Sequence, residues 1–254
     1  MGTTKIEWAE KTWSPMTGCT PISEGCKNCY AKRMALRLQA MGQEKYAAGF
    51  TPTFHKNALY DITPKQKPAL IFVCSMADLF HKDVRPFTLE QIFTRMAICS
   101  QHRFMVLTKR ANRMAQVSRR MQKLWYGSPG WPLPNVALGV TCENQARANE
   151  RLPILAQCPA AYKFISVEPM LGPVDLDEAI DCRLRGADWE LVICGGESGP
   201  GARPMNADWA RSLRDECAFT ELPFHFKQHG GVNKRAAGRL LDGVTHDGAI
   251  NWRT

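Results

Sequence analysis

The sequence predicts an α/β protein with a partial or full parallel β/α barrel of about six or seven strands. Short apolar runs suited to buried strands recur along the chain, and segments of helical period separate them. Parallel strands need crossover connections, and right-handed crossovers curl such a series into a barrel. The chain has 254 residues, of which 44% are hydrophobic, so it can bury one core of this kind. We therefore expect a single domain over residues 1–254.

The elements expected from the pattern alternate along the chain. The expected strands are Lys11–Pro15, Leu70–Ser75, Phe104–Thr108, Val136–Thr141, Lys163–Val167, Leu191–Cys194 and Phe224–Lys227. The expected helices are Tyr30–Met41, Leu89–Gln101, Ala111–Leu124, Gln145–Ala156 and Ala207–Glu216, the last of them capped by Asn206. The Pro- and Gly-bearing stretches Gly42–Pro68 and Tyr126–Pro134 are expected as surface loops or lids. An irregular, polar extension is expected from about residue 228 to residue 254.

The composition bears on compartment and partners. No run of some eighteen apolar residues is present, and the segment Met1–Glu7 lacks the apolar stretch of a signal peptide, so we expect a soluble cytoplasmic protein with no membrane partner. The formal net charge of +9 favours an anionic partner such as a nucleic acid or a nucleotide. Two basic stretches, Lys32–Arg37 and Arg110–Lys123, are either solvated faces or phosphate-contacting surfaces. The sequence leaves the oligomeric state open.

The ten cysteines form two groups. Seven lie singly in or beside apolar segments, where a free cysteine behaves as a small buried hydrophobe: Cys74, Cys99, Cys142, Cys158, Cys182, Cys194 and Cys217. The other three, Cys19, Cys26 and Cys29, share the loop of residues 18–31 between the first strand and the first helix. In a reducing compartment, clustered cysteines indicate metal or redox chemistry.

Three thiolates in one loop favour an iron–sulfur cluster. A 4Fe-4S cluster bound by three cysteines keeps one iron free for a small-molecule ligand. Structural zinc takes four Cys or His ligands, and no second Cys-x-x-Cys pair is present. Two other interpretations stay open: a zinc site completed by His55 or His81, and a reduced turn without metal. A structural metal would suit a non-catalytic nucleic-acid-binding protein.

Polar residues follow the ends of the expected strands, where parallel barrels bind their ligands. They are Ser75, Asp78, Thr108, Lys109, Thr141, Glu143, Glu168, Glu197 and Ser198, and we expect Arg203, Lys227 and Gln228 to face the same edge. Each of them is also compatible with a helix cap or a loop salt bridge. Asp78, Glu168 and Glu197 raise the alternative of a magnesium-dependent nuclease, which leaves the three cysteines unexplained.

Five segments carry a resemblance to a known family: Gly18–Ala31, Ser75–His81, Ser166–Pro173, Gly195–Gly199 and Phe226–Gln228. Over nearly the whole chain they resemble the phage and bacterial three-cysteine-motif family of unknown function. That family is similar to radical S-adenosylmethionine (SAM) enzymes, whose partial barrel carries a cluster loop after its first strand. The resemblance implies an enzyme with a 4Fe-4S cluster on Cys19, Cys26 and Cys29, with SAM as second cofactor and an external electron donor such as flavodoxin or ferredoxin.

The resemblance also implies a reaction and roles for the strand-end residues. SAM would yield a 5′-deoxyadenosyl radical that abstracts hydrogen, with a nucleic acid or a nucleotide as candidate substrate. The implied cofactor-binding residues are Tyr30, Ser75, Asp78, Thr108, Lys109, Thr141 and Glu143. From their place at the strand ends, we expect Glu168 and Glu197 to be catalytic, and we expect the substrate-binding residues to be Ser198, Arg203, Lys227 and Gln228. The spacing differs from that of radical SAM enzymes, because six residues separate Cys19 from Cys26 where those enzymes generally have three.

Overall fold

The computed structural model describes residues 2–4, 6–127, 130–180 and 189–253, and contacts along the chain divide it into two compact units. Unit 1 comprises Met1–Ile22, Cys29–Leu138 and Cys158–Ala161, and unit 2 comprises Ser23–Asn28, Gly139–Gln157 and Tyr162–Thr254. The expectation of a single domain stays a prediction. Cys182, expected to be buried, lies outside the described residues.

The described strands confirm the predicted α/β class. The main sheet has eight strands in the order β1-β2-β5-β6-β7-β8-β9-β10, and seven of these described strands are parallel, as in a partial parallel β/α barrel. Strand β7, Val136–Thr141, is divided between the units after Leu138. A second, two-stranded sheet pairs β3, Met16–Thr17, with β4, Thr53–Phe54.

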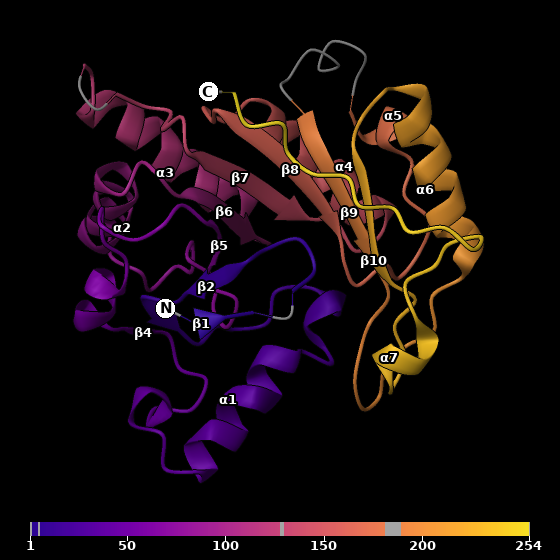
Figure 1. Ribbon diagram of the computed structural model, residues 1–254, viewed down its shortest axis with the longest axis horizontal. Coiled ribbons are helices and arrows are strands. Elements are labelled where there is room, and N and C mark those ends of the chain that lie inside the picture. The colour runs from indigo at the N-terminus through magenta and orange to yellow at the C-terminus, as the bar shows by residue number, and fades with distance from the viewer. Residues whose placement is uncertain (1, 5, 128–129, 181–188, 254) are drawn as a thin grey trace. The chain divides into compact units, whose positions relative to one another are not determined.

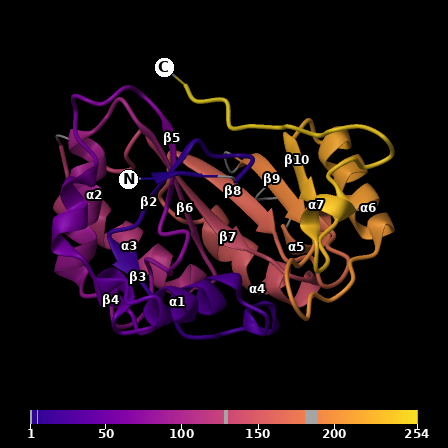
Figure 2. The ribbon, with the colours of Figure 1, turned by 60° about the horizontal axis from the view of Figure 1, so that its bottom comes forward.

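Unit 1 contains the N-terminal strands and three helices (Figure 1). Its strands in the main sheet are β1 (Gly2–Thr3), β2 (Lys11–Trp13), β5 (Leu70–Val73), β6 (Arg103–Thr108) and the first half of β7. Its helices are α1 (Tyr30–Ala40), α2 (Pro86–Ile98) and α3 (Ala111–Leu124). Helices α2 and α3 lie side by side in both ribbon views (Figures 1 and 2). Proline at the first position of α2 suits a helix start, because its missing N–H has no partner there.

Unit 2 contains the remaining strands and the helices that pack on them. Its strands are the second half of β7, β8 (Tyr162–Val167), β9 (Trp189–Gly195) and β10 (Phe224–Gln228). Its helices are α4 (Gln145–Ala156), α5 (Leu176–Ala179), α6 (Ala207–Phe219) and α7 (Lys234–Ala237). Helix α6 packs on β9 and β10, and the Asn206 side chain accepts a hydrogen bond from Asp208 N at 2.9 Å, which confirms the predicted cap.

The apolar runs become buried strands. Every residue of β7 and β8 is buried, as expected for strands covered on both faces. The expected strand from Leu70 to Ser75 ends earlier, at Val73, because Cys74 has a φ of 57° and cannot continue an extended strand. The stretch expected as a loop, Gly42–Pro68, contains β4 and two short 3₁₀ helices, Glu44–Tyr46 and Lys56–Asp61. Among the described helices, none has the length and apolar character needed to cross a membrane.

Gly18 fixes the backbone that leads into the cysteine loop. Its φ is 82°, and a Cβ at this position would collide with the carbonyl of Thr51. The next residue, Cys19, donates its backbone N–H to the carbonyl of Phe50 at 3.0 Å. Only glycine satisfies both the backbone conformation and the close approach.

Gly18→Ala should lower the free energy of unfolding by about 2–5 kcal/mol, because it adds a backbone collision to the cost of a positive φ. Gly42→Ala is the matched control, since Gly42 also has a positive φ, of 72°, but nothing within 4 Å of the added Cβ. The control should lose only about 1–2 kcal/mol in urea unfolding. Equal losses in the two variants would contradict a close approach at Gly18.

Candidate functional site

Exposure separates the loop cysteines from the others. All nine cysteines in the described part of the chain are free thiols, and Cys19, Cys26 and Cys29 are partly exposed. The buried ones are Cys74, Cys99, Cys142, Cys158, Cys194 and Cys217, as predicted. Burial raises the pKa of the Cys74 and Cys217 thiols to about 12, so both stay protonated. Since a metal binds the thiolate, the buried thiols are poor ligands and the loop thiols are the suitable donors.

The loop divides between the two units. Cys19 and Cys29 belong to unit 1, where Cys29 is the residue that precedes the first turn of α1. Cys26 belongs to unit 2, at the end of the 3₁₀ helix Glu24–Cys26. Within the described ranges, no three or more His, Cys, Asp and Glu side chains are gathered as a metal site. The donor set fits a thiolate-bound metal by its chemistry, and the ligation stays a prediction.

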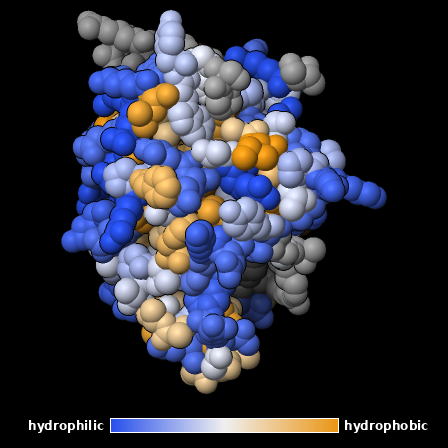
Figure 3. Space-filling model, turned by 90° about the vertical axis from the view of Figure 1, so that its left-hand side faces the viewer, coloured by the Kyte–Doolittle hydropathy of each residue, from blue (hydrophilic) through white to orange (hydrophobic). Residues whose placement is uncertain are grey.

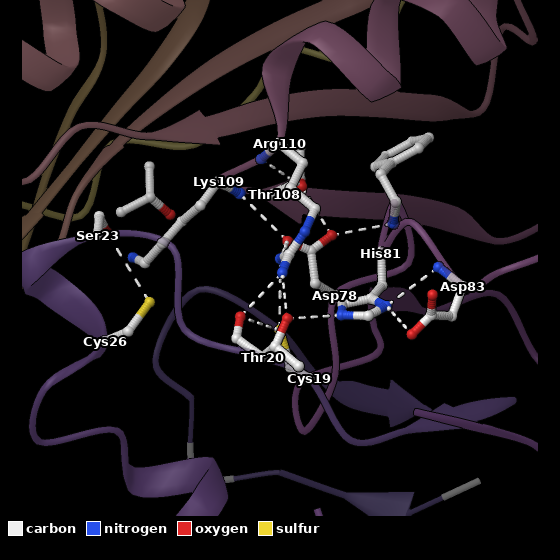
Figure 4. Close-up of polar contacts among 12 residues, drawn as sticks. Cys19, Thr20, Ser23, Cys26, Asp78, His81, Asp83, Thr108, Lys109 and Arg110 are labelled. Carbon is white, nitrogen blue, oxygen red and sulfur yellow. Dashed lines mark hydrogen bonds and ion pairs between the residues drawn. The ribbon is translucent and has the colours of Figure 1, made fainter. Parts of the chain in front are cut away.

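In unit 1, Asp78 lies just beyond the end of β5 and is 7% exposed (Figure 4). Its Oδ1 accepts hydrogen bonds from Phe80 N at 2.9 Å and Thr108 Oγ1 at 2.7 Å. Its Oδ2 accepts from Arg110 Nη1 at 2.7 Å and from Lys109 N at 3.4 Å. The structure thus brings together Asp78 and Thr108, both predicted site residues, with both oxygens of the carboxylate engaged by internal donors.

Arg110 connects Asp78 to the cysteine loop. Its Nη1 also lies 3.4 Å from Cys19 Sγ, and its Nη2 donates to the carbonyl of Thr20 at 2.8 Å. Burial opposes the charge of the guanidinium, but Asp78 and Cys19 outweigh it and raise the pKa of Arg110 above its usual value. The sequence indicated this arginine only as part of a basic stretch. Its position directly after the strand-end pair Thr108-Lys109 was the available signal.

The two histidines considered as zinc ligands are engaged elsewhere. His81 is fully buried, its Nε2 lies 2.7 Å from Thr20 Oγ1, and its Nδ1 accepts a hydrogen bond from Asp83 N at 3.2 Å. This pattern assigns the proton to Nε2, and burial lowers the pKa of His81. His55 Nε2 lies 2.7 Å from Thr17 Oγ1. The described contacts of both rings therefore disfavour a zinc site completed by histidine.

Tyr30 and Ser75 are brought together at the first turn of α1. The hydroxyl of Tyr30 donates to the backbone carbonyl of Ser75, while half of the tyrosine residue stays exposed. This contact fixes the ring next to Cys29. Tyr30 therefore combines a held hydroxyl with a side chain that is only partly buried.

In unit 2, Glu143 holds the middle of the cysteine loop. The Ser23 hydroxyl donates to Glu143 Oε1, and a Cβ at Gly25 would collide with the same carboxylate. Arg151 Nη1 donates to Glu143 Oε2 at 2.8 Å and to the carbonyl of Thr141 at 2.6 Å. Both charged side chains are at most 2% exposed. The described contacts of Thr141 and Glu143 are thus structural, and they anchor the loop segment that contains Cys26.

A second contact in unit 2 holds the 3₁₀ helix of the loop. Asn144 Nδ2 donates to Glu24 Oε1 at 2.6 Å, and Arg147 Nη2 donates to Glu24 Oε2 at 3.1 Å. Hydrogen bonding, first from the backbone of Glu24 and then from Arg147 and Asn144, lowers the pKa of Glu24 to about 2. Sequence reasoning missed these three residues, because nothing local indicates which arginine pairs with Glu24.

Glu197 anchors the far end of the same segment. It is 6% exposed and accepts hydrogen bonds from Arg203 N, Nε and Nη2 at 2.9, 2.9 and 2.6 Å, and from Asn28 Nδ2 at 2.9 Å. Asn28 Nδ2 also donates to the carbonyl of Gly201 at 2.7 Å. Glu197 and Arg203, predicted in separate roles, therefore form one ion pair that fixes Asn28, the residue directly before Cys29.

The other predicted residues of unit 2 lie at the ends of β8, β9 and β10. Lys227 Nζ pairs with Glu168 Oε1 at 2.5 Å. Gln228 is buried and donates to the carbonyl of Gly196 at 3.0 Å. Ser198 forms a parallel bridge with Gly231. These contacts hold two turns against each other, and the close approach at Gly196 is to the backbone of His229.

The carboxylates proposed for a nuclease are all paired with cations. Asp78, Glu168 and Glu197 each form an ion pair with a basic side chain of their own unit. A magnesium site needs carboxylate oxygens that face the metal, and a bound arginine or lysine competes for them. These ion pairs make a magnesium site less favourable, and the nuclease interpretation stays a prediction.

A family model described as "Protein of unknown function (DUF5131)" matches residues 3–249, which is nearly the whole chain. A search of the curated proteins and a search of the solved structures found no match. The matched family is one of unknown function, as the three-cysteine resemblance implied, and its description mentions neither SAM nor iron. The chemistry therefore has to be argued from the residues of this chain.

Glu197 predicts an acid-dependent loss of stability. Burial alone would raise the pKa of this carboxyl, but hydrogen bonds from Arg203 and Asn28 and the charge of Arg203 lower it from 4.5 to about 2. A depressed native pKa contributes stability above pH 4.5 that is lost as the pH falls toward 2, up to about 3 kcal/mol for this shift. Denaturant unfolding between pH 4.5 and 2 should show a flatter pH dependence for Glu197→Gln than for the wild type. Parallel curves would contradict the assignment.

Proposed function

The chain belongs to the DUF5131 family of proteins of unknown function, and from this premise we propose that it is an iron–sulfur enzyme of the radical SAM type. One observation carries the proposal. Among the described cysteines, the three of the loop are the partly exposed ones, whereas the six others are buried. A thiol that serves as a packing residue gains from burial, and a metal ligand has to reach the metal as a thiolate. This contrast supports the loop as a ligand set.

Cys19, Cys26 and Cys29 would hold the cluster. When bound, a cluster on three thiolates would supply one electron to SAM at its remaining iron. The residues of the chain would contribute placement. The loop segment Ser23–Asn28 is anchored by three buried or half-buried carboxylates, so its backbone is held before any cofactor binds.

Tyr30 is the best-placed candidate to contact the adenine of SAM. It directly follows Cys29, its hydroxyl is held by the carbonyl of Ser75, and half of the residue is exposed. An aromatic ring with a fixed position can stack on a nucleobase at little entropic cost. Asp78 and Glu143 are weaker candidates than the sequence implied, because their carboxylates already accept hydrogen bonds from arginines.

Each of the single changes Cys19→Ala, Cys26→Ala and Cys29→Ala should abolish most cluster binding, because loss of one thiolate from a three-ligand set exposes a second iron. The measurement is iron and acid-labile sulfide per chain after anaerobic purification or reconstitution. Wild-type protein that holds a cluster should also convert SAM to 5′-deoxyadenosine when it is reduced.

Cys194→Ala is the matched control, since it removes a thiol that is fully buried in β9. It should retain wild-type iron and sulfide. Full cluster content in all three loop variants would refute the ligand assignment. A bound cluster or zinc ion with no SAM cleavage would instead favour the non-catalytic nucleic-acid-binding alternative.

We also propose a nucleic acid or a nucleotide as the substrate class. Helices α1 and α3 contain basic but no acidic residues, and their exposed cations include Lys32, Arg37, Arg119 and Lys123. On the side of unit 1 that carries α2 and α3, hydrophilic side chains separate the apolar ones (Figure 3). Trp131 is partly buried and packs against Phe93 with ring centroids 5.1 Å apart, whereas Tyr126 is 96% exposed and can stack on a base.

Affinity for labelled single- and double-stranded DNA and RNA should fall steeply as salt rises, because cations that contact phosphates release counterions. The expected log–log slope is about 0.7–0.9 per phosphate neutralised. The double change Arg119→Gln and Lys123→Gln should reduce this slope by about one to two. Absence of binding at low salt would redirect the search to small metabolites or peptides.

A further inference from the structure

We infer that Arg110 is a hydrogen-bond donor to the sulfur of Cys19, and that Asp78 is the positioning residue that holds it there. In the cluster-bound protein this donor would stabilise negative charge on Cys19 and so raise the reduction potential of the cluster. The second statement rests on the proposed function, whereas the first concerns the chain itself.

The guanidinium of Arg110 contacts Cys19 with one of two nitrogens that each have two acceptors. Nη1 lies 3.4 Å from Cys19 Sγ and 2.7 Å from Asp78 Oδ2. Nη2 lies 2.8 Å from the carbonyl of Thr20 and 3.2 Å from its Oγ1 (Figure 4). The Arg110 side chain is only 11% exposed, so water competes little for these donors. A planar guanidinium is suited to this geometry, because its donors point in fixed directions.

Asp78 is itself held rigidly, which makes the placement of the guanidinium reproducible. Its two oxygens accept four hydrogen bonds, two of them from the backbone N–H groups of Phe80 and Lys109. Thr108 adds a third from its hydroxyl at 2.7 Å, and the same Thr108 oxygen accepts from Arg110 N at 2.9 Å. Arg110 is therefore fixed at both its backbone and its guanidinium end.

A donor and a positive charge next to a ligating sulfur favour the state with more negative charge. Reduction adds one electron to a cluster, and hydrogen bonds to the sulfurs and net charge are among the factors that set its potential. Removal of the donor should therefore make the potential more negative. Lysine keeps the charge but not the planar guanidinium, so Arg110→Lys separates the hydrogen bond from the charge.

The test compares Arg110→Gln, Arg110→Lys and Asp78→Glu with the wild type. The matched control is Arg120→Gln, which removes an arginine of the same helix that pairs with Glu90 at the surface. Each variant is reconstituted anaerobically, its iron and sulfide are counted, and its reduction potential is measured by a titration followed by electron paramagnetic resonance. We expect Arg110→Gln to lower the equilibrium constant of one-electron reduction at least tenfold, which is about 59 mV.

Asp78→Glu keeps the negative charge but moves the carboxylate that anchors the guanidinium, so it should make the potential more negative by a smaller amount, with cluster content retained. Arg110→Lys should give an intermediate shift, and Arg120→Gln should leave the potential unchanged. A purely structural role of Asp78 would change cluster content or stability and not the potential. An unchanged potential in Arg110→Gln with a full cluster would overturn the inference. If Arg110→Gln does not fold, Arg110→Lys and Asp78→Glu carry the same test.

A wild-type chain that binds no iron would contradict the proposed function. The contact between Arg110 and Cys19 can then be tested on the apoprotein. Its alkylation by iodoacetamide at one fixed pH is followed peptide by peptide by mass spectrometry. Because a donor that stabilises negative sulfur promotes alkylation, Arg110→Gln should slow the reaction of Cys19 several-fold and leave that of Cys29 unchanged. Equal Cys19 rates in wild type and variant would overturn the contact.

Discussion

Buried carboxylates that accept hydrogen bonds from arginines are the interaction on which the candidate site depends. In unit 1, Asp78 orients Arg110 toward the sulfur of Cys19. In unit 2, Glu143 and Glu197 hold the two ends of the loop segment that contains Cys26. Removal of either partner would leave a charge with little water around it, which is costly in a protein interior. The loop is therefore shaped by charges that are already satisfied within the chain.

The acidic residues at the strand ends contact groups of the chain itself. A carboxylate that binds a cofactor has to keep an oxygen directed at the ligand, whereas Asp78 and Glu197 each accept four hydrogen bonds from groups of the chain. In the described structure these contacts position Arg110 and Asn28. Tyr30 is half exposed and the three loop thiols are partly exposed in the described part of the chain. Recognition would then rely on an aromatic face and sulfur more than on carboxylates.

The cysteines illustrate how one residue type takes two roles in the same chain. Cys74 and Cys194 follow or end apolar strands, where packing excludes water and keeps the thiol protonated. Cys19, Cys26 and Cys29 lie in a loop whose backbone is fixed by Gly18, by a short 3₁₀ helix and by the start of α1. Exposure and neighbouring donors, and not the residue type, decide which thiols can take part in chemistry.

The sequence by itself determined the fold class, because the local spacing of apolar residues predicts whether a segment forms a buried strand or an amphipathic helix. Strands such as Val136–Thr141, the cap at Asn206 and the division of the cysteines were all predictable in this way. Only the tertiary structure decided which charges pair. Asn28 meets Glu197 from 169 positions away, and no local pattern distinguishes this partner from other acidic residues. Which charged side chains pair depends on which distant segments the fold brings together. The burial that strengthens each pair exists only after folding.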